Sequence, residues 1–398
     1  MIPRKAYLDY LISARNLQVI KVISGIRRCG KSTLLELFIH YLKDQGIGDD
    51  QIIFINFEDM AYDELRDYKS LYKYIGSKMD SNKMTYIFLD EIQHVSQFER
   101  AVDSLFIQKN VDLYITGSNA YFMSGELATL LSGRYIEVEM LPLSFREYTS
   151  GISSTKSISE LYSRYLLNSS FPYTVQLGDN DLIINEYLQG LYSTVILKDV
   201  ITRHKISNVM MLEDVTRFLF DNIGNQTSLT KIANTMTSHG RKIDPKTVEK
   251  YIKALTDSLI LYKAKRYNIK GKQYLKTLEK YYIVDIGLRY MLLGKRSTDV
   301  GHILENVVYL ELIRRGYDVY VGQVDNLEVD FVAMKNGNIS YYQVAATVRE
   351  ASTLKRELTP LQKIDDHYPK LILTLDDDPV ADYNGIQRMN ALEFLLQK

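Results

Sequence analysis

Cysteine is almost absent from this chain of 398 residues, in which Cys29 is the only one. A disulfide framework is therefore excluded, and a reducing compartment, the cytoplasm, is expected. No apolar run reaches membrane-spanning length, and the N-terminus, MIPRKAYLDYL, lacks the pattern of a signal peptide, so no membrane partner is expected.

Net charge is also lacking, because 49 basic side chains balance 49 acidic ones. This balance argues against a protein that coats nucleic acid and leaves room only for local basic patches.

What the chain does contain is a glycine-rich run, SGIRRCGKST, that includes the pattern G-x-x-x-x-G-K-[S/T]. A β-branched run at 19–24 precedes it and a helix-forming run at 34–42 follows, so the loop joins a strand to a helix N-terminus. Backbone N–H groups in such a loop close on phosphate oxygens, Lys31 would neutralise the β- and γ-phosphates, and Ser32 would offer its hydroxyl to Mg²⁺. The alternative is a turn with an incidental lysine. The predicted binding residues for a nucleoside triphosphate are Gly25, Ile26, Arg27, Arg28, Cys29, Gly30, Lys31, Ser32 and Thr33.

A second motif lies at residues 84–92, MTYIFLDEI, where an apolar run ends in two adjacent acids. The run is typical of a buried parallel strand, and open α/β sheets bind ligands at the carboxyl ends of such strands. Asp90 is expected to hold Mg²⁺ through water, and Glu91 to polarise a water for in-line attack on the γ-phosphate. P-loop kinases and many GTPases lack a glutamate there, so the pair indicates ATP hydrolysis. The alternative is an acidic pair that caps the next helix.

Two further residues are candidates for the same reaction. A third strand candidate, 111–116, runs into Gly-Ser-Asn, where a polar sensor of the γ-phosphate would lie. Ser118 and Asn119 both fit by position, and Asn119 is the preferred candidate, although the tripeptide is also ordinary turn chemistry. Arg134 precedes a strand candidate at 135–141 and would reach a nucleotide in its own or a neighbouring subunit as a finger. The alternative for Arg134 is a solvated surface arginine.

The chain length implies two or three domains. Residues 1–150 alternate strands with helices, including IIFINFED at 52–59, which predicts an α/β P-loop ATPase domain with a parallel sheet and helices on both faces. A polar stretch then opens a helical linker or lid region at 151–207. The remaining chain is expected to form a winged-helix domain at 208–295 and a small α/β domain at 296–398.

The third segment has the order helix, turn, helix and hairpin, which resembles a winged helix. Asp244 and Pro245 are start signals for its longer helix, and four apolar residues would share one face of that helix: Val248, Ile252, Leu255 and Leu259. The hairpin at 263–280 carries only one acid, Glu279. Its basic residues are Lys263, Lys265, Arg266, Lys270, Lys272, Lys276 and Lys280. Binding of DNA phosphates through this wing is therefore predicted, and packing between domains is the equally weighted alternative.

The last segment carries a separate set of acidic and amide side chains. Glu305 lies near the start of a predicted helix, Asp330 on a predicted strand, and Gln343 near the end of the next strand. An acid on a helix, an acid on one strand and E/Q-x-K on the next is the metal-site order of restriction-type nucleases. Here Ala345 stands at the lysine position, so a degenerate, structural or binding version of that fold is favoured over an intact nuclease. Lys355, on the following helix, is a candidate replacement for the missing lysine.

Taken together, these motifs resemble those of the bacterial and archaeal AAA-like ATPases whose C-terminal domain of unknown function has a nuclease-like core. The resemblance covers essentially the whole chain and rests on SGIRRCGKST, FINFED, IFLDEIQ, ITGSNA, LLSGRYIEVEMLPLSFREY, YIVDIGLRYMLL and GHILENVVYLELIRRGYDVYVG, followed by EVDF and YYQV. It implies ATP binding at residues 25–33, Mg²⁺ coordination involving Asp90, and a catalytic Glu91. The chain departs from the family at Ser169 and Ser170, where glycines tend to precede the Phe-Pro pair.

The combined interpretation is a Mg²⁺-dependent ATPase that acts as a nucleotide-driven switch, with nucleic acid as one candidate partner. An ATP-gated nuclease is one alternative, and an ATP-responsive DNA-binding regulator that does not hydrolyse ATP is another. The C-terminal domain is also a candidate surface for a protein partner or a second copy of the chain. Oligomerisation matters because Arg134 could then act across a subunit boundary.

Overall fold

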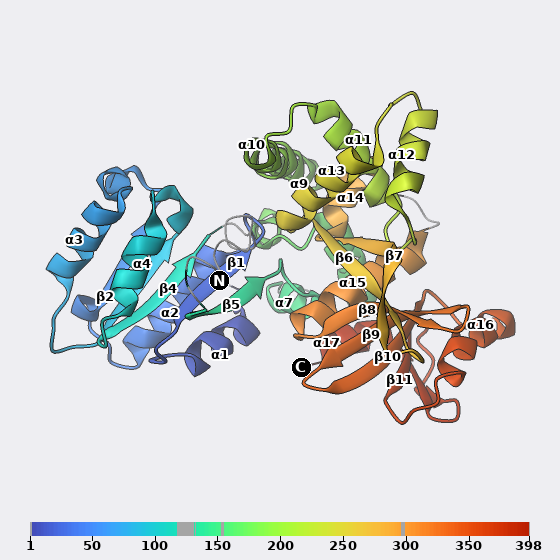
Figure 1. Ribbon diagram of the computed structural model, residues 1–398. Coiled ribbons are helices and arrows are strands. Elements are labelled where there is room, and N and C mark those ends of the chain that lie inside the picture. Colours follow the sequence, from blue (N-terminus) through green and yellow to red (C-terminus); the bar gives the residue numbers. More distant parts are fainter. Residues whose placement is uncertain (1, 118–130, 132, 153–154, 296–298, 398) are drawn as a thin grey trace. The chain divides into compact units, whose positions relative to one another are not determined.

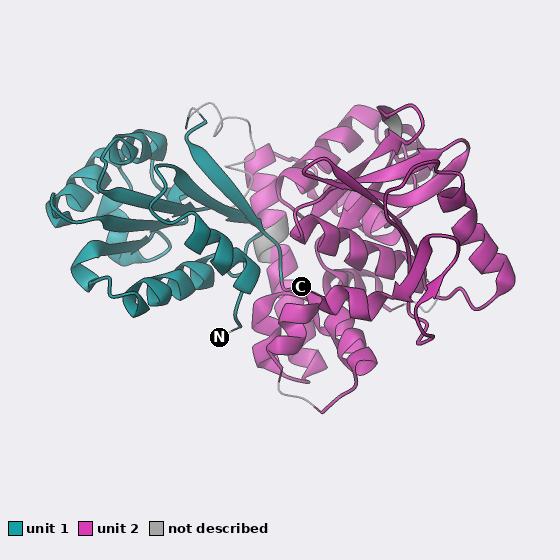
Figure 2. Cartoon of the chain, turned by 90° about the horizontal axis from the view of Figure 1, so that it is seen from below, with its two compact units in different colours: residues 1–142 teal, residues 143–398 magenta. Residues whose placement is uncertain are grey.

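The computed structural model describes residues 2–117, 131, 133–152, 155–295 and 299–397 (Figure 1). Contacts between residues divide the chain into two compact units, 1–142 and 143–398, which are coloured separately in Figure 2. In the described part of the chain no helix is long and apolar enough to cross a bilayer.

The first unit alternates strands and helices. Its strands are β1 Ile20–Gly25, β2 Ile52–Asn56, β3 Thr85–Asp90, β4 Val111–Thr116 and β5 Tyr135–Met140. Its α-helices are α1 Lys5–Ser13, α2 Lys31–Asp44, α3 Tyr68–Lys78 and α4 Phe98–Phe106, with short 3₁₀ helices η1 Asp49–Gln51, η2 Met60–Leu65 and η3 Ile92–His94.

The described strands of the first unit form one parallel sheet in the order β2-β3-β4-β1-β5. Every residue of β1, β3 and β4 is buried, which explains why these three strands are nearly continuous apolar runs in the sequence. The strand β4 lies between the two motif strands β1 and β3. The predicted α/β fold with a P-loop-type parallel sheet is therefore confirmed.

Helices pack on both faces of this sheet. On one face, Leu71 of α3 and Val102 of α4 belong to a buried cluster that includes Val22 of β1. On the other face, the ring of Phe38 on α2 contacts those of Phe88 and Tyr114, with centroids 6.1 and 5.0 Å away. Burial of these apolar and aromatic side chains stabilises the sheet that carries the motif loops at its carboxyl edge.

The second unit begins with helices. They are α7 Phe145–Ser150, α8 Ile158–Asn168, the 3₁₀ helix η4 Pro172–Leu177, α9 Asp181–Gly190, the π-helical turn η5 Leu191–Leu197, α10 Lys198–His204, α11 Val209–Asp221, α12 Leu229–Ser238, α13 Pro245–Asp257 and α14 Ile286–Leu293. Asp244 caps α13 by accepting hydrogen bonds from two backbone N–H groups of its first turn, as its place before Pro245 predicts. The four apolar residues predicted to share a face of this helix and the turn after it are all buried.

The loop after α8 contains Ser169 and Ser170, where the resembling family tends to have glycine. Ser169 has φ of 74°, a backbone conformation that glycine adopts without strain. Ser170 donates hydrogen bonds from its N–H and its hydroxyl to the Asp285 carboxylate, each 2.6 Å long. This loop is therefore held by the start of α14 within the second unit.

The remaining elements of the second unit are mostly strands. They are β6 Leu261–Asn268, β7 Gln273–Ile283, α15 Val300–Arg314, β8 Asp318–Val324, β9 Leu327–Lys335, β10 Asn338–Ala345, α16 Ala351–Gln362, β11 Lys370–Thr374, β12 Ala381–Asp382, β13 Ile386–Asn390 and α17 Ala391–Leu396. The described strands form one sheet in the order β12-β13-β11-β10-β9-β8-β6-β7. Because β6 pairs in parallel with β8, the hairpin of the predicted wing and the strands of the C-terminal segment belong to the same sheet.

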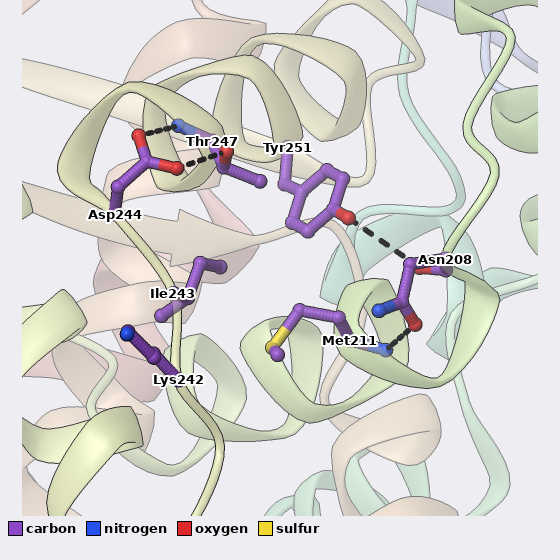
Figure 3. A pocket seen from close by; sticks show the side chains of 7 residues that line it. All are labelled: Asn208, Met211, Lys242, Ile243, Asp244, Thr247 and Tyr251. Atoms are coloured by element: carbon purple, nitrogen blue, oxygen red, sulfur yellow. Dashed lines mark hydrogen bonds between the residues drawn. The ribbon is translucent and has the colours of Figure 1, made fainter.

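Figure 3 shows a pocket of about 490 Å³ beside α11 and α13. Its lining residues are Asn208, Met211, Lys242, Ile243, Asp244, Thr247 and Tyr251. Asn208 accepts a hydrogen bond from the N–H of Met211, and Asp244 accepts bonds from Thr247. The side chains of Asn208 and Asp244 therefore cap the N-termini of α11 and α13.

Candidate nucleotide-binding site

The loop between β1 and α2 has two positions that need glycine. Gly25 has φ of 150°, and a Cβ there would lie 2.4 Å from the carbonyl oxygen of Met140. Gly30 precedes the first residue of α2 with φ of 102°. A loop that places its backbone N–H groups at a helix N-terminus in this way is an anion-binding arrangement, as the motif predicts.

Lys31 is the first residue of α2, and its side chain lies inside the loop. It is buried, with its Nζ 3.3 Å from the carbonyl oxygen of Gly25 and 3.5 Å from Oε1 of Glu91. Residues of the two sequence motifs thus meet at the carboxyl edge of the sheet. A phosphate bound by the loop would compete with Glu91 for the ammonium group of Lys31.

Asp90 ends β3 and is fully buried. Its Oδ1 accepts a hydrogen bond from the hydroxyl of Thr116, while its Oδ2 is buried and has no hydrogen-bond partner among the described residues. Burial raises the pKa of the Asp90 carboxyl above its ordinary value, against the opposing effect of hydrogen bonds from Thr116 and Ser32. A buried carboxylate with an orphaned oxygen, on a carboxyl group that also interacts with the Ser32 hydroxyl, fits a hard, oxygen-seeking cation such as Mg²⁺.

Glu91 is held in a left-handed backbone conformation, with φ of 54°. Its N–H donates a 3.0 Å hydrogen bond to the Thr116 hydroxyl, and its Oε2 accepts one from the Gln93 amide. Burial alone favours the protonated acid, but Lys31 and the Gln93 hydrogen bond hold the pKa of Glu91 below its ordinary value. Glu91 is therefore a carboxylate at neutral pH, the form that accepts a proton.

Thr116, the last residue of β4, was not among the residues predicted from the sequence. Its hydroxyl donates to Asp90 and accepts from the N–H of Glu91, so it connects the two acids. The only signal for it was its place at the end of the strand that leads to the predicted sensor. Ser118 and Asn119 themselves lie outside the described residues.

Comparisons with known proteins show the family and the fold to which this chain belongs. A family model described as an AAA domain matches residues 18–149, and one described as a domain of unknown function, DUF8612, matches residues 159–299. An uncharacterized protein of Haemophilus influenzae is 40% identical over 401 residues, covering 100% of this chain and 99% of that protein. The uncharacterized protein MJ1544 of Methanocaldococcus jannaschii is 30% identical over 366 residues, covering 86% of this chain and 78% of that protein.

Among solved structures, the Walker-type ATPase of Pyrococcus abyssi matches with a TM-score of 0.51 and 17% identity, covering 73% of this chain and 96% of that one. This likeness shows the shared fold. The chain belongs to the family of AAA-type P-loop ATPases.

Arg134 does not lie near the phosphate loop. Its carbonyl oxygen accepts a hydrogen bond from the N–H of Ile20, which opens β1, whereas Gly25 ends that strand. Five strand steps separate the two edges by about 16 Å. Arg134 as a finger therefore stays a prediction for a neighbouring subunit.

Two side chains near Glu91 were not predicted from the sequence. Glu58 and His94 each have one ligand atom within 4.8 Å of a carboxylate oxygen of Glu91, in a group of three that are mutually this close. Glu58 also pairs with Arg27 of the phosphate loop at 2.7 Å. The loop is thereby connected to the segment after β2, next to Glu91.

In the C-terminal segment, Glu305 and Asp330, two of the three predicted residues, lie beside a lysine from β7. The Nζ of Lys280 lies 2.8 Å from Glu305, 2.6 Å from Glu328 and 3.8 Å from Asp330. Gln343 bonds elsewhere, because its Oε1 accepts from the N–H of Asp330 and its Nε2 donates to Glu357.

Electrostatics around Lys280 favour its charged form. Burial by itself favours the neutral amine, but the surrounding carboxylates hold the pKa of Lys280 above its ordinary value. Lys355, the candidate replacement for the missing lysine, is exposed on α16, and the Glu357 side chain of that helix is the one that bonds to Gln343. Lys280 is one of the predicted basic residues of the wing, and no local pattern indicates that it faces these acids.

The wing itself has less unpaired charge than the sequence suggests. Lys263 pairs with Glu279 at 2.7 Å, Lys270 pairs with Asp325 at 2.6 Å, and Lys280 lies in the buried cluster. Lys265 and Lys272 are exposed. Three tyrosine rings, with centroids 5.2 to 6.0 Å apart, lie next to the hairpin: Tyr267 on β6, Tyr274 on β7 and Tyr320 on β8.

Proposed function

We propose that this protein is a Mg²⁺-dependent ATPase that acts as a nucleotide-driven switch. The observation that carries the proposal is the buried contact between Lys31 and Glu91, beside the orphaned Oδ2 of Asp90. A basic residue for phosphates, an acid for a metal ion and a second acid for a proton meet at one edge of one sheet. This is the set of groups that phosphoryl transfer to water requires.

Each group has a separate task in this proposal. The loop from Gly25 to Thr33 binds the phosphates through its backbone N–H groups, and Lys31 neutralises their charge. Ser32 and Asp90 would hold Mg²⁺, which supplies further positive charge to the phosphate oxygens. Glu91 accepts the proton of the attacking water, and Thr116 fixes the position of both acids through its hydroxyl.

The contact between Lys31 and Glu91 suggests how nucleotide binding changes the site. An ammonium group that turns to phosphate oxygens weakens its ion pair with Glu91, so the carboxylate is released for the water. Because Glu58 contacts both Arg27 and the Glu91 region, the same change reaches the segment after β2. We propose that this change transmits the nucleotide state to the second unit and its partner.

Nucleic acid is one candidate partner, through Lys265, Lys272 and the exposed ring of Tyr274 on the hairpin. The pairing of Lys263 and Lys270 with acids makes this a small basic patch, so a protein partner of the second unit is the alternative.

The experiment is phosphate release from ATP by the full-length protein, with Mg²⁺ or with a chelator, and with or without duplex DNA. Turnover that needs Mg²⁺ supports the ATPase, and a rise with DNA that fades at higher salt supports nucleic acid as the partner. A rate of ATP turnover that is the same with and without DNA favours a protein partner. Tight ATP binding without any turnover under all conditions would contradict the ATPase and favour a non-hydrolysing regulator.

A further inference from the structure

The C-terminal part of the second unit has the element order α15, β8, β9, β10, α16 and β11, with an acid on the helix and an acid on β9. Such acids converge on divalent cations in nuclease sites. Here Glu305 and Asp330 do converge, but on the ammonium group of Lys280. Lys280 comes from β7, outside this set of elements, and is almost fully buried.

The geometry around Lys280 matches an ammonium group. Lysine has three N–H donors and no acceptor, and three carboxylates lie within 3.8 Å of its Nζ. A magnesium ion needs about six oxygen ligands at roughly 2.0–2.1 Å and keeps several waters. An ammonium group already lies among the acids that would supply those ligands.

Each carboxylate also has a second partner inside the protein. Glu305 accepts a 2.6 Å hydrogen bond from the Tyr282 hydroxyl. Glu328 accepts one from the Gln226 amide, and Asp330 accepts one from the N–H of Val344. Each of the three acids is therefore fixed in place by a donor besides Lys280.

The segment before α12 also covers Glu305 from outside. A Cβ placed on Gly224 would lie 3.0 Å from Oε2 of Glu305, so the backbone there passes directly over the carboxylate. The N–H of Gly224 donates to the carbonyl oxygen of Tyr281, and Thr227 pairs with Glu279. A phosphodiester would have to displace this hydrogen-bonded segment to reach the acids.

We propose that Lys280 is a built-in cation that takes the place of a divalent metal ion, so that this nuclease-like site is a closed ion cluster and does not cleave nucleic acid. The cluster fastens the β6–β7 hairpin to α15 and β9, so that the hairpin and the C-terminal strands move together as one rigid body. The residues present therefore do not fit a metal-dependent nuclease.

Terbium luminescence tests this proposal, because Tb³⁺ replaces Mg²⁺ and Ca²⁺ at oxygen sites and tyrosine sensitises its emission. The hydroxyl of Tyr282 donates to Glu305, and the ring of Tyr309 stacks on that of Tyr282 with centroids 4.2 Å apart, so a terbium ion bound here would emit strongly. We expect wild type and Glu305→Gln to give equal emission, because no ion enters. Wild-type emission that Glu305→Gln removes would overturn the proposal.

The removal of the lysine gives the converse test. Lys280→Ala should gain terbium emission, and the double variant Lys280→Ala/Glu305→Gln should lose it again. Lys263→Ala is the matched control, since Lys263 is a hairpin lysine whose pairing with Glu279 is partly exposed. If Lys280→Ala folds, as circular dichroism reports, and gains no emission, the acids are not a latent metal site and the proposal is wrong.

Two further measurements keep the test independent of that variant. Wild-type protein with Mg²⁺ or Mn²⁺ should leave supercoiled plasmid intact, and cleavage that Asp330→Ala abolishes would overturn the proposal. Lys280→Met should unfold at a clearly lower denaturant concentration than Lys263→Met, because it leaves buried carboxylates without their cation. Equal stability of the two variants would contradict the fastening role.

Discussion

Lys31 and Glu91 lie in contact, with Nζ and Oε1 3.5 Å apart and both side chains almost fully buried. They come from different motifs, one after β1 and one after β3, and β4 lies between those strands. A phosphate that takes over the Lys31 ammonium group supplies a new charged partner for it, so the ion pair can be exchanged without leaving the lysine uncompensated. We take this pair as the resting arrangement of the proposed ATPase site.

Lys31→Ala should weaken nucleotide binding by roughly 10- to 100-fold, because a charge-assisted bond to phosphate contributes about 1.5–3 kcal/mol. Titration with a fluorescent ATP analogue measures the affinity. Lys43→Ala is the matched control, since Lys43 is a half-exposed lysine in the last turn of the same helix, where it pairs with Asp49. Equal affinity of Lys31→Ala and Lys43→Ala would show that nucleotide binds elsewhere.

Gly25→Ala should destabilise the first unit by about 1–3 kcal/mol and impair nucleotide binding, because the new Cβ would lie 2.4 Å from a backbone oxygen. The relevant unfolding transition is the one that Mg²⁺-ATP shifts upward in wild type. The control is Gly76→Ala in α3, where a Cβ meets nothing within 4 Å. That substitution should stabilise the helix by about 0.5–1 kcal/mol. A Gly25→Ala protein as stable as wild type would refute the close approach.

Asp90→Asn should stabilise the first unit near neutral pH while it removes ATP hydrolysis. Burial raises the pKa of the folded Asp90 carboxyl above that of the unfolded chain, so stability falls as pH rises from the unfolded value through the folded one. The neutral amide escapes this loss and can still accept the Thr116 hydrogen bond. Thermal unfolding without Mg²⁺ or nucleotide should give a gain for Asp90→Asn at about pH 8 that shrinks toward about pH 4. A gain that is independent of pH would contradict this explanation.

Cys29 should react slowly with alkylating reagents in the native protein. The thiol is fully buried, and burial raises its pKa despite the nearby Lys31 and Arg4. Since the chain has one cysteine, mass spectrometry reads its labelling without ambiguity. We expect fast labelling in denaturant, slow labelling in buffer and slower labelling still with Mg²⁺-ATP. Native and denatured protein that label at the same rate would mean that the loop is open.

The sequence predicted the parts of the first unit that depend on local signals. The strand at 111–116 has the predicted bounds, and Lys31, Asp90 and Glu91 meet because the carboxyl ends of parallel strands share one edge of a sheet. Thr116 was missed because its role depends on which strand lies beside β3, and local periodicity does not encode strand order.

The second unit shows where such reasoning fails. Lys280 was counted as a basic residue of the wing, yet it lies among Glu305, Glu328 and Asp330. Those contacts arise from the pairing of β6 with β8, which joins distant segments of the chain and leaves no pattern in either segment alone. Charge counting along the hairpin likewise gave no sign that Asp325, from another turn, pairs with Lys270.

The most direct test of the account is ATP turnover by Glu91→Gln beside wild type, with nucleotide affinity measured on both proteins. Glutamine keeps the shape of the side chain and a carbonyl oxygen but cannot take a proton. We predict nearly unchanged affinity and a fall in turnover of roughly 10²–10⁴-fold. Equal turnover by the two proteins would contradict the assignment of Glu91 as the group that activates water.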